Sequence, residues 1–423
     1  FDDALSLKVI NDNNFEIGVH IADVSHYVIP DTKLDEEAYE RATSVYLVDR
    51  VIPMLPEVLS NNICSLKPNV DRLAYSVLFE MDEKANLVDY KIKKTVIHSD
   101  VRFTYQSAQD VIDNKEGELK TELLLLDKLS KILRKKRQEN GSINFESTEV
   151  KFILDKDNNP IDVYFKESLS TNHLIEEFML LANKTVAKHI GFPKKEAKTF
   201  VYRIHDIPDT DRISTLNNIV KKFGHTIDST STPKLSSSLN SLLKKVKGKN
   251  EQQMVETLTI RSMAKAVYTT DNIGHYGLAF DYYSHFTSPI RRYPDLIVHR
   301  LLEQYINGEK SADKENIEKI CKHCSEMEKV ASTAERDSIK YMQVKFLQHK
   351  VGETFEGVIS GVTEWGLYVE ITENKCEGLV KVSSIKDDHY IYDEKKYTLI
   401  GYRTKVSYQL GQKVKIKIQR ADL

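Results

Sequence analysis

The sequence predicts an α+β protein in which a large mixed domain precedes a small all-β barrel. Strand and turn patterns come first, long helical patterns fill the middle, and short β-branched and aromatic segments begin at Val351. A chain of 423 residues is too long for one ordinary domain. We therefore place a boundary near Lys350, between residues 1–349 and 351–423.

The N-terminal part of the large domain is expected to consist of β-hairpins. Segments 4–10 and 15–22 have the composition of strands, and the Asn-rich segment 11–14 supplies turn residues. Segments 73–81 and 87–96 form a second such pair around a charged turn. Between the two pairs we expect a helix, a strand and an irregular proline-containing loop, in that order: 34–41, 44–48 and 51–56.

The middle of the chain is expected to be mostly helical. Segment 119–138 places its apolar residues opposite lysines and arginines, and segment 174–189 has a similar core spacing. A hairpin is expected from residues 150–153 and 161–165, around an Asn-Asn-Pro turn. Further helices are expected through residue 222 and then over 235–245, 252–269, 295–306 and 313–346.

Several short predicted strands after Val351 are typical of a small barrel of the oligonucleotide-binding type, the OB-fold. They are segments 355–360, 366–371, 378–382, 404–408 and 413–418. Such barrels present aromatic and basic residues on one face, and Trp365 and Tyr368 suit that use. Lys413, Lys415 and Lys417 alternate, so they lie on one side of the last strand. They either bind RNA or keep a sheet edge soluble.

The composition is that of an ordinary globular protein. Apolar residues make up 40% of the chain, the formal net charge is −2, and no segment approaches the ~18 apolar residues of a membrane span. The four cysteines fit a reducing compartment, so we expect a cytoplasmic protein without membrane attachment. Cys321 and Cys324 form a lone C-x-x-C pair within a helical pattern, which favours ordinary helix residues over a metal or redox site.

Two adjacent carboxylates, Asp2 and Asp3, stand directly before the first predicted strand. Because like charges repel, such a pair must remain solvated or bind a cation. Hard divalent cations such as Mg²⁺ take carboxylate oxygens as ligands and can activate a bound water. The pair is a candidate metal site, and the structural alternative is a surface turn. The chain starts at Phe1 without a Met, so we expect further sequence upstream.

Arg291 and Arg292 are bracketed by Pro289 and Pro294, which restrict the backbone around them. Adjacent side chains point in different directions in most conformations. One arginine can therefore form a fork to a phosphate while the other pairs with an internal carboxylate. The alternative is a structural loop before a helix, with Arg292 in a salt bridge.

Tyr46 and Phe145 are aromatic residues that lie near short polar segments. Aromatic rings stack on the bases of single-stranded nucleic acids whatever their sequence. They also fill hydrophobic cores, which is the more frequent role of a lone aromatic residue.

Taken in order, these segments resemble the ribonuclease R/ribonuclease II family of exoribonucleases. The resemblance extends over nearly the whole chain, in segments 2–4, 19–28, 43–46, 52–56, 59–61, 174–179, 202–206 and 285–295. The barrel resembles the S1 RNA-binding domain through segments 378–380 and 382–383. The run from Pro289 to Asp295 is closer to ribonuclease R than to ribonuclease II.

The resemblance implies an RNB catalytic domain in residues 1–349 and an S1 domain in residues 351–423, whose C-terminal end is a candidate truncation. Such enzymes are monomers that degrade single-stranded RNA processively from its 3′ end and release nucleoside 5′-monophosphates with Mg²⁺. Four aspartates in the pattern D-x5-D-x-D-D hold the metal. Asp2 and Asp3 match the last two, and the first two, like the family's cold-shock domains, would lie upstream of Phe1.

The same resemblance implies roles for individual residues. Asp2 would help to activate the attacking water, and Asp3 would bind the metal. Arg291 would stabilise the scissile phosphate, and Glu335 would support that arginine or the terminal nucleotide. Further RNA contacts are expected from Tyr46 and Phe145, which would clamp the 3′ bases, and from Glu177, Arg292, Trp365, Tyr368, Lys413, Lys415 and Lys417.

Two other functions are compatible with the sequence. An RNA-binding protein on the same fold that has lost catalysis would be supported by substituted metal ligands, whereas both ligand positions in this chain are Asp. An unrelated α+β hydrolase with a fused barrel would have to reproduce the ordered set of motifs by chance.

Overall fold

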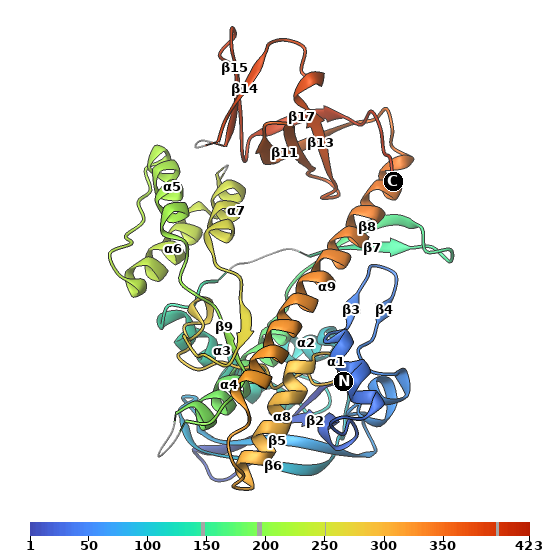
Figure 1. Ribbon diagram of the computed structural model, residues 1–423, viewed down its shortest axis with the longest axis vertical. Coiled ribbons are helices and arrows are strands. Elements are labelled where there is room, and N and C mark those ends of the chain that lie inside the picture. The colour runs from blue at the N-terminus through green and yellow to red at the C-terminus, as the bar shows by residue number, and fades with distance from the viewer. Residues whose placement is uncertain (145–148, 193–196, 250, 395–396) are drawn as a thin grey trace.

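A computed structural model describes residues 1–144, 149–192, 197–249, 251–394 and 397–423 (Figure 1). A large mixed domain lies at one end and a small all-β barrel at the other. The long helix α9 (Lys314–Gln348) runs from the first to the second. The predicted α+β class is confirmed.

A four-stranded antiparallel sheet lies at the base of the large domain (Figure 1). Its strands, in spatial order, are β1 (Asp3–Val9), β2 (Asn14–Ala22), β5 (Asp71–Asp82) and β6 (Leu87–His98). Both predicted strand pairs are confirmed, with Leu5 opposite Val19 and Val77 opposite Ile92. Apolar side chains of β2 and β5 are buried because they face the helices that cover the sheet.

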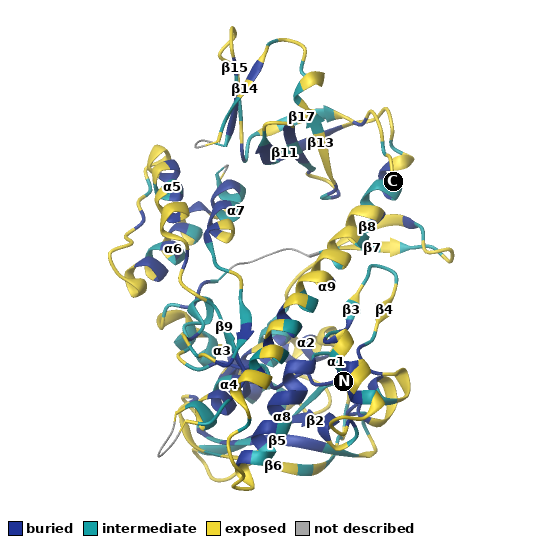
Figure 2. Ribbon diagram, in the orientation of Figure 1, coloured by how far each residue is buried: buried dark blue, intermediate teal, exposed yellow. Residues whose placement is uncertain are grey.

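Helices pack over this sheet and close the main hydrophobic core. They are α2 (Tyr105–Asn114), α3 (Lys120–Glu139), α4 (Ser170–Gly191) and α8 (Tyr293–Ile306). Phe79 of β5, Phe178 of α4 and Leu296 of α8 are fully buried in one cluster. Figure 2 shows the same burial along β2, β5 and α8. The core therefore joins the start of the chain to residues some three hundred positions later.

The segment between β2 and β5 contains α1 (Lys33–Arg41), β3 (Val45–Tyr46) and β4 (Val51–Ile52). The predicted helix at 34–41 is confirmed, and the Thr32 side chain caps it by accepting a hydrogen bond from the Asp35 amide at 3.3 Å. The expectation that 51–56 is irregular throughout is wrong, because β4 pairs with β3. A ladder of two residues is too short to mark itself by alternation.

A second hydrophobic core holds together α5 (Thr210–Val220), α6 (Thr232–Val246) and α7 (Gln252–Ser262). The helix predicted over 252–269 is wrong beyond Ser262. Its last residues form β10 (Val267–Thr269), which pairs with β9 (Tyr202–Ile204). The Tyr268 amide also donates to Ser325 of α9 at 2.9 Å. Both contacts are long-range, so the local helical pattern did not reveal them.

A predicted hairpin lies beside the C-terminal part of α9. Its strands are β7 (Glu149–Leu154) and β8 (Pro160–Lys166), as expected from the Asn-Asn-Pro turn. Phe152 and Val163 pack against a cluster that includes Phe346 of α9 and Phe355 of the barrel. The hairpin is thereby fixed to the junction between the helix and the barrel.

The barrel consists of two antiparallel sheets with strand orders β13-β12-β11-β17 and β14-β15-β16. The strands are β11 (Thr354–Thr363), β12 (Gly366–Ile371), β13 (Glu377–Lys381), β14 (Tyr390–Asp393), β15 (Thr398–Gly401), β16 (Ser407–Gln409) and β17 (Lys413–Lys417). The strands predicted at 355–360, 366–371, 378–382 and 413–418 are confirmed. β14 and β15 were not predicted, since each has only four residues.

Short helical turns complete the secondary structure: η1 (Val24–His26), η2 (Leu59–Ile63), η3 (Lys221–Phe223), η4 (Tyr276–Leu278) and η5 (Val382–Ser384). Cys321 and Cys324 are buried, unbonded residues of α9, as the helical pattern predicted. In the part of the chain that the structure describes, no helix has the length and apolarity to cross a membrane.

The main core makes a testable prediction about stability. Phe178→Ala should lower the free energy of unfolding by about 3–5 kcal/mol, because the ring is fully buried between the sheet and α8. Val88→Ala on β6, where the side chain is 58% exposed, is the matched control and should change it by less than about 0.5 kcal/mol. Equal midpoints in a denaturant titration of the two variants would contradict this packing.

Candidate active site at the N-terminal aspartates

Asp2 and Asp3 lie where β1 begins, next to the end of β2. The Asp2 carbonyl accepts a hydrogen bond from the Ala22 amide at 2.8 Å, and Asp3 pairs with Ile21 across the ladder. The hairpin therefore fixes the backbone of both residues. Both residues are partly buried and belong to the start of a strand rather than to a surface turn.

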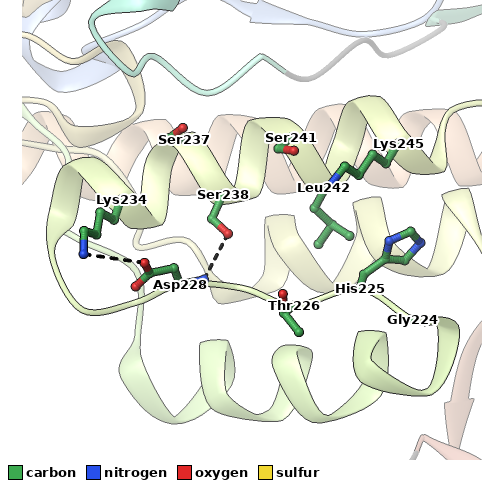
Figure 3. Close-up of a pocket in the computed structure, with 10 residues that line it drawn as sticks. All are labelled: Gly224, His225, Thr226, Asp228, Lys234, Ser237, Ser238, Ser241, Leu242 and Lys245. Carbon is green, nitrogen blue, oxygen red and sulfur yellow. Dashed lines mark hydrogen bonds and ion pairs between the residues drawn. The ribbon is translucent and has the colours of Figure 1, made fainter.

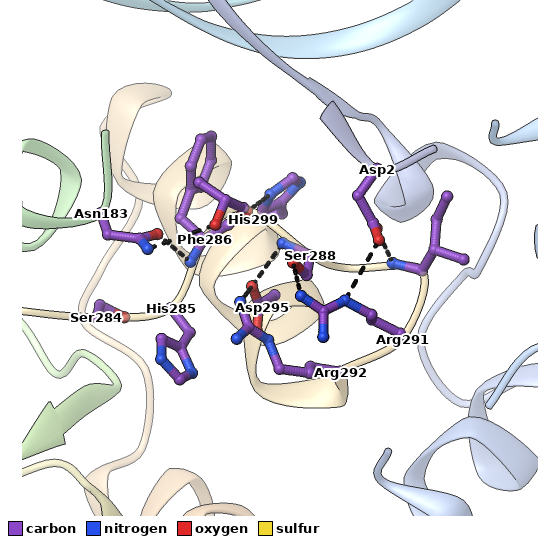
Figure 4. Close-up of polar contacts among 12 residues, drawn as sticks. Asp2, Asn183, Ser284, His285, Phe286, Ser288, Arg291, Arg292, Asp295 and His299 are labelled. Atoms are coloured by element: carbon purple, nitrogen blue, oxygen red, sulfur yellow. Dashed lines mark hydrogen bonds and ion pairs between the residues drawn. The ribbon is translucent and has the colours of Figure 1, made fainter. Parts of the chain in front are cut away.

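The loop before α8, although 288 positions away in the sequence, lies against Asp2 (Figure 4). The Ile290 amide donates to Asp2 Oδ1 at 2.9 Å, and Arg291 Nε lies 3.7 Å from Asp2 Oδ2. The fold thus places Asp2 and Arg291, two of the residues predicted for the site, next to each other. The Arg291 side chain remains 43% exposed, so its guanidinium can also reach a ligand.

Burial dominates the electrostatics of the aspartates. It raises the pKa of Asp2 to about 6, against the opposing effects of the Ile290 amide and the Arg291 charge. The pKa of Asp3 is also raised by burial. Burial disfavours the charged form of both neighbouring carboxyl groups, and a bound cation would favour it.

The donor set fits a hard divalent cation. Asp2 and Asp3 offer only oxygen ligands, and such an ion is commonly held by one or two carboxylates, with waters and substrate phosphates completing its shell. Among the described residues, no cluster of three or more His, Cys, Asp or Glu side chains could hold a metal. These two aspartates would therefore be a partial protein shell.

The two arginines do point in different directions. Arg292 donates two hydrogen bonds to Asp295, at 2.9 and 2.7 Å, and Asp295 is fully buried. This matches the salt-bridge alternative for Arg292 and occupies the fork that was considered for RNA. Arg291 instead donates to Ser288 Oγ at 3.0 Å and faces Asp2 (Figure 4).

Side chains from neighbouring elements hold this loop in place. Asn183 of α4 accepts a hydrogen bond from the Phe286 amide at 2.8 Å, and His299 of α8 lies 2.8 Å from the Phe286 carbonyl. Asp295 accepts from the Ser288 amide at 2.8 Å. None of these positioning roles was predicted: the Asn183 contact joins residues 103 positions apart, and the other two depend on how the loop folds back onto α8.

Tyr46 lies on the β3–β4 hairpin and is 47% exposed, so it is not a core residue. Its amide donates to Glu335 of α9 at 2.9 Å, and the Val48 amide donates to Ser338 at 3.1 Å. Burial raises the pKa of the Tyr46 hydroxyl, and the nearby Arg291 charge opposes the rise. Glu335 was expected to support Arg291 or a nucleotide, whereas in this structure its carboxylate accepts the hydrogen bond of the Tyr46 backbone amide.

Glu177 and Phe145 are placed differently from Tyr46. Glu177 is buried on α4 and forms an ion pair with Arg137 of α3, with a shortest distance of 2.5 Å. Its carboxylate therefore already has a cationic partner. Phe145 lies outside the described residues.

A cavity of about 1000 Å³ extends from Tyr46 to the barrel. It is bordered by the β3–β4 turn, the β7–β8 hairpin, α7, α9 and the barrel strands. Lys413 lines it. The exposed Lys415 and Lys417 alternate with Lys413 along β17, in the register predicted for one side of the strand. Trp365 is 68% exposed in the β11–β12 turn, and Tyr368 is partly exposed on β12.

A smaller cavity of about 450 Å³ lies in the helical layer, between α6 and the segment from Gly224 to Asp228 (Figure 3). Its lining is polar, with the hydroxyl groups of Ser237, Ser238 and Ser241 along one side of α6. It shares no lining residue with the cavity at Tyr46 or with the aspartates.

Two family models match the chain. The RNB domain matches residues 1–308, and the S1 RNA binding domain matches residues 348–423. Ribonuclease R 1 of Lactococcus lactis is 40% identical over the whole chain, which covers 52% of that protein. Ribonuclease R of Thermotoga maritima is 43% identical, with 61% of it covered. The chain thus spans about half to three fifths of the length of these relatives.

Solved structures agree with this assignment. The chain resembles Mycoplasma genitalium RNase R in complex with ribose methylated single-stranded RNA, with a TM-score of 0.93 and 30% identity over 100% of the chain and 67% of that protein. The complex of the same enzyme with double-stranded RNA gives a TM-score of 0.82 over 90% of the chain and 68% of that protein. With most of its length matched by the RNB model, the chain belongs to the RNB domain family and carries an S1 RNA-binding domain.

Proposed function

We propose that this chain provides the catalytic core of a processive 3′→5′ exoribonuclease that hydrolyses single-stranded RNA to nucleoside 5′-monophosphates. One observation carries the proposal: the partly buried Asp2 contacts the Ile290 amide and Arg291, close to an exposed Tyr46. Carboxylate, cation and stacking surface are the groups that phosphodiester hydrolysis at a strand end requires. The similarity to ribonuclease R proteins supports the same assignment.

We assign catalysis and RNA binding to different parts of the chain. Residues 1–349 form the catalytic domain and residues 351–423 the S1 RNA-binding domain. The protein acts as a cytoplasmic monomer on the 3′ ends of single-stranded RNA. Asp2 and Asp3 hold Mg²⁺, which when bound polarises the phosphate and lowers the pKa of a coordinated water.

Each side chain of the site has a separate role in the proposed reaction. Asp2 orients the attacking water by accepting its hydrogen bond. Arg291, held by Ser288, lies where it can neutralise the charge that builds on the phosphate oxygens. Tyr46 stacks on a 3′ base, and Glu335 positions it by accepting the hydrogen bond of its amide.

Further RNA contacts are assigned to the remaining candidates. Trp365, Tyr368, Lys413, Lys415 and Lys417 contact RNA on the barrel, through rings for the bases and ammonium groups for the phosphates. Phe145 is proposed as the second stacking residue from the family resemblance alone. Glu177 is paired with Arg137 and Arg292 with Asp295, so we assign both to positioning the elements that carry them rather than to direct RNA contact.

Asp2→Asn in the full-length protein should abolish turnover and leave RNA affinity largely intact, because the amide removes a charged ligand without changing the shape of the side chain. Release of mononucleotides from 5′-labelled RNA and binding of the same RNA are measured side by side. Asp12→Asn, in the exposed β1–β2 turn, is the matched control. Unchanged turnover in Asp2→Asn would rule out the role assigned to Asp2. Binding by the wild type without degradation would favour a non-catalytic RNA-binding protein.

Tyr46→Ala should change the length of the final undigested oligonucleotide, because a shorter strand loses its stacking partner at the site. The limit product is sized on a gel against that of the wild type. Tyr341→Ala removes a ring of equal exposure, 47%, from α9 and should leave the limit product unchanged. An identical limit product in Tyr46→Ala would remove Tyr46 from the clamp.

Replacing Arg291 should affect turnover, whereas replacing Arg292 should affect stability. Arg291→Ala should lower kcat by about 10²–10³ with little effect on unfolding. Arg292→Ala should cost about 3–5 kcal/mol of stability, because it leaves Asp295 buried without its partner. Replacing Arg292 and Asp295 together by Leu should recover part of that loss. The reverse pattern, with Arg292 governing turnover alone, would contradict this assignment.

A further inference from the structure

We propose that Tyr164 of β8 is a further stacking residue, which holds an unpaired base of the RNA strand on its way to Tyr46. The inference rests on the proposed function and extends it to a subsite upstream of the reacting end. Tyr46 and Tyr164 line the same cavity of about 1000 Å³, so a single strand that occupies it would meet both rings. The substrate class is single-stranded RNA, because a base hidden in a pair offers no free face for stacking.

The exposure of Tyr164 fits this role. The side chain is 48% exposed, close to the 47% of Tyr46, and no buried cluster of the described residues includes it. A tyrosine that stabilised the hairpin alone would be expected to bury its ring. Base stacking needs an accessible aromatic face in a fixed position, and Tyr164 provides the accessible face.

The hairpin fixes the position of that face. Tyr164 pairs with Lys151 across the ladder, and the neighbouring pair, Phe152 and Val163, packs into the cluster at the end of α9. Side chains alternate along a strand, so anchoring Val163 leaves Tyr164 on the opposite face, toward the cavity. The ring is therefore supported by a packed element rather than by a flexible loop.

The charges of the cavity suit a phosphate backbone. Its lining includes four lysines, Lys151, Lys249, Lys375 and Lys413, against two glutamates, Glu256 and Glu370. Lys375 pairs with Glu370 at 2.7 Å, and Glu256 accepts a hydrogen bond from Gln252 at 2.7 Å, so both carboxylates have polar partners within the lining. Lys413 lines the cavity and is the first of three alternating lysines on β17, followed by Lys415 and Lys417.

A stacking subsite can be located by removing one base at a time. RNAs that each carry a single abasic nucleotide, at successive distances from the 3′ end, are bound to the full-length Asp2→Asn protein. Affinity should fall at the position that meets Tyr164. In the Tyr164→Ala variant, unmodified RNA should bind about tenfold more weakly. An abasic nucleotide at the position that meets Tyr164 should then cause no further loss of affinity. Tyr164→Phe keeps the ring and should restore the wild-type pattern.

Phe165→Ala is the matched control, because it deletes the next ring along β8, which is 41% exposed and does not line the cavity. Its scan should equal that of the parent. The proposal is overturned if Tyr164→Ala keeps every sensitive position, or if Phe165→Ala loses the same one. The scan measures binding without turnover, so failure of the exoribonuclease assignment would appear separately, as intact RNA with the wild-type protein and Mg²⁺.

Discussion

The contact between Asp2 and the loop at Ile290 and Arg291 is the constraint on which the site depends. It joins residues 288 positions apart in the chain, and only the main core, shared by β2, β5, α4 and α8, brings them together. The cost of burying Asp2 is reflected in its raised pKa, and the amide and guanidinium offset part of it. A carboxylate kept in such surroundings is better explained by chemistry than by stability.

The long helix α9 extends this arrangement from the core to the barrel. It holds Tyr46 and Val48 through Glu335 and Ser338, and its C-terminal end packs with the β7–β8 hairpin and the first barrel strand. Through these contacts, α9 links Tyr46 to the barrel, whose last strand, β17, carries Lys413, Lys415 and Lys417.

Local patterns were sufficient to predict much of the fold. The hairpins at 11–14 and 82–86, the helix over 174–189 and the barrel after Val351 follow from periodicity and turn residues. The ordered motifs also predicted Asp2, Arg291 and Tyr46 as site residues, and these three lie near one another in the structure. Local patterns failed where long-range contacts decide: β10 forms because β9 is available, and the partners of Glu177 and Glu335 come from other elements. Tyr164 carried no signal in the sequence, since its role depends on which face of β8 is anchored.

The central claim is that this site hydrolyses RNA from the 3′ end with a divalent metal. The most direct measurement is digestion of 5′-labelled single-stranded RNA by the full-length wild-type protein, with Mg²⁺ or with EDTA, resolved on a gel. The account predicts Mg²⁺-dependent release of mononucleotides and a short labelled end product with few intermediates. RNA that remains intact with Mg²⁺, or that is cut internally into a ladder of fragments, would contradict it.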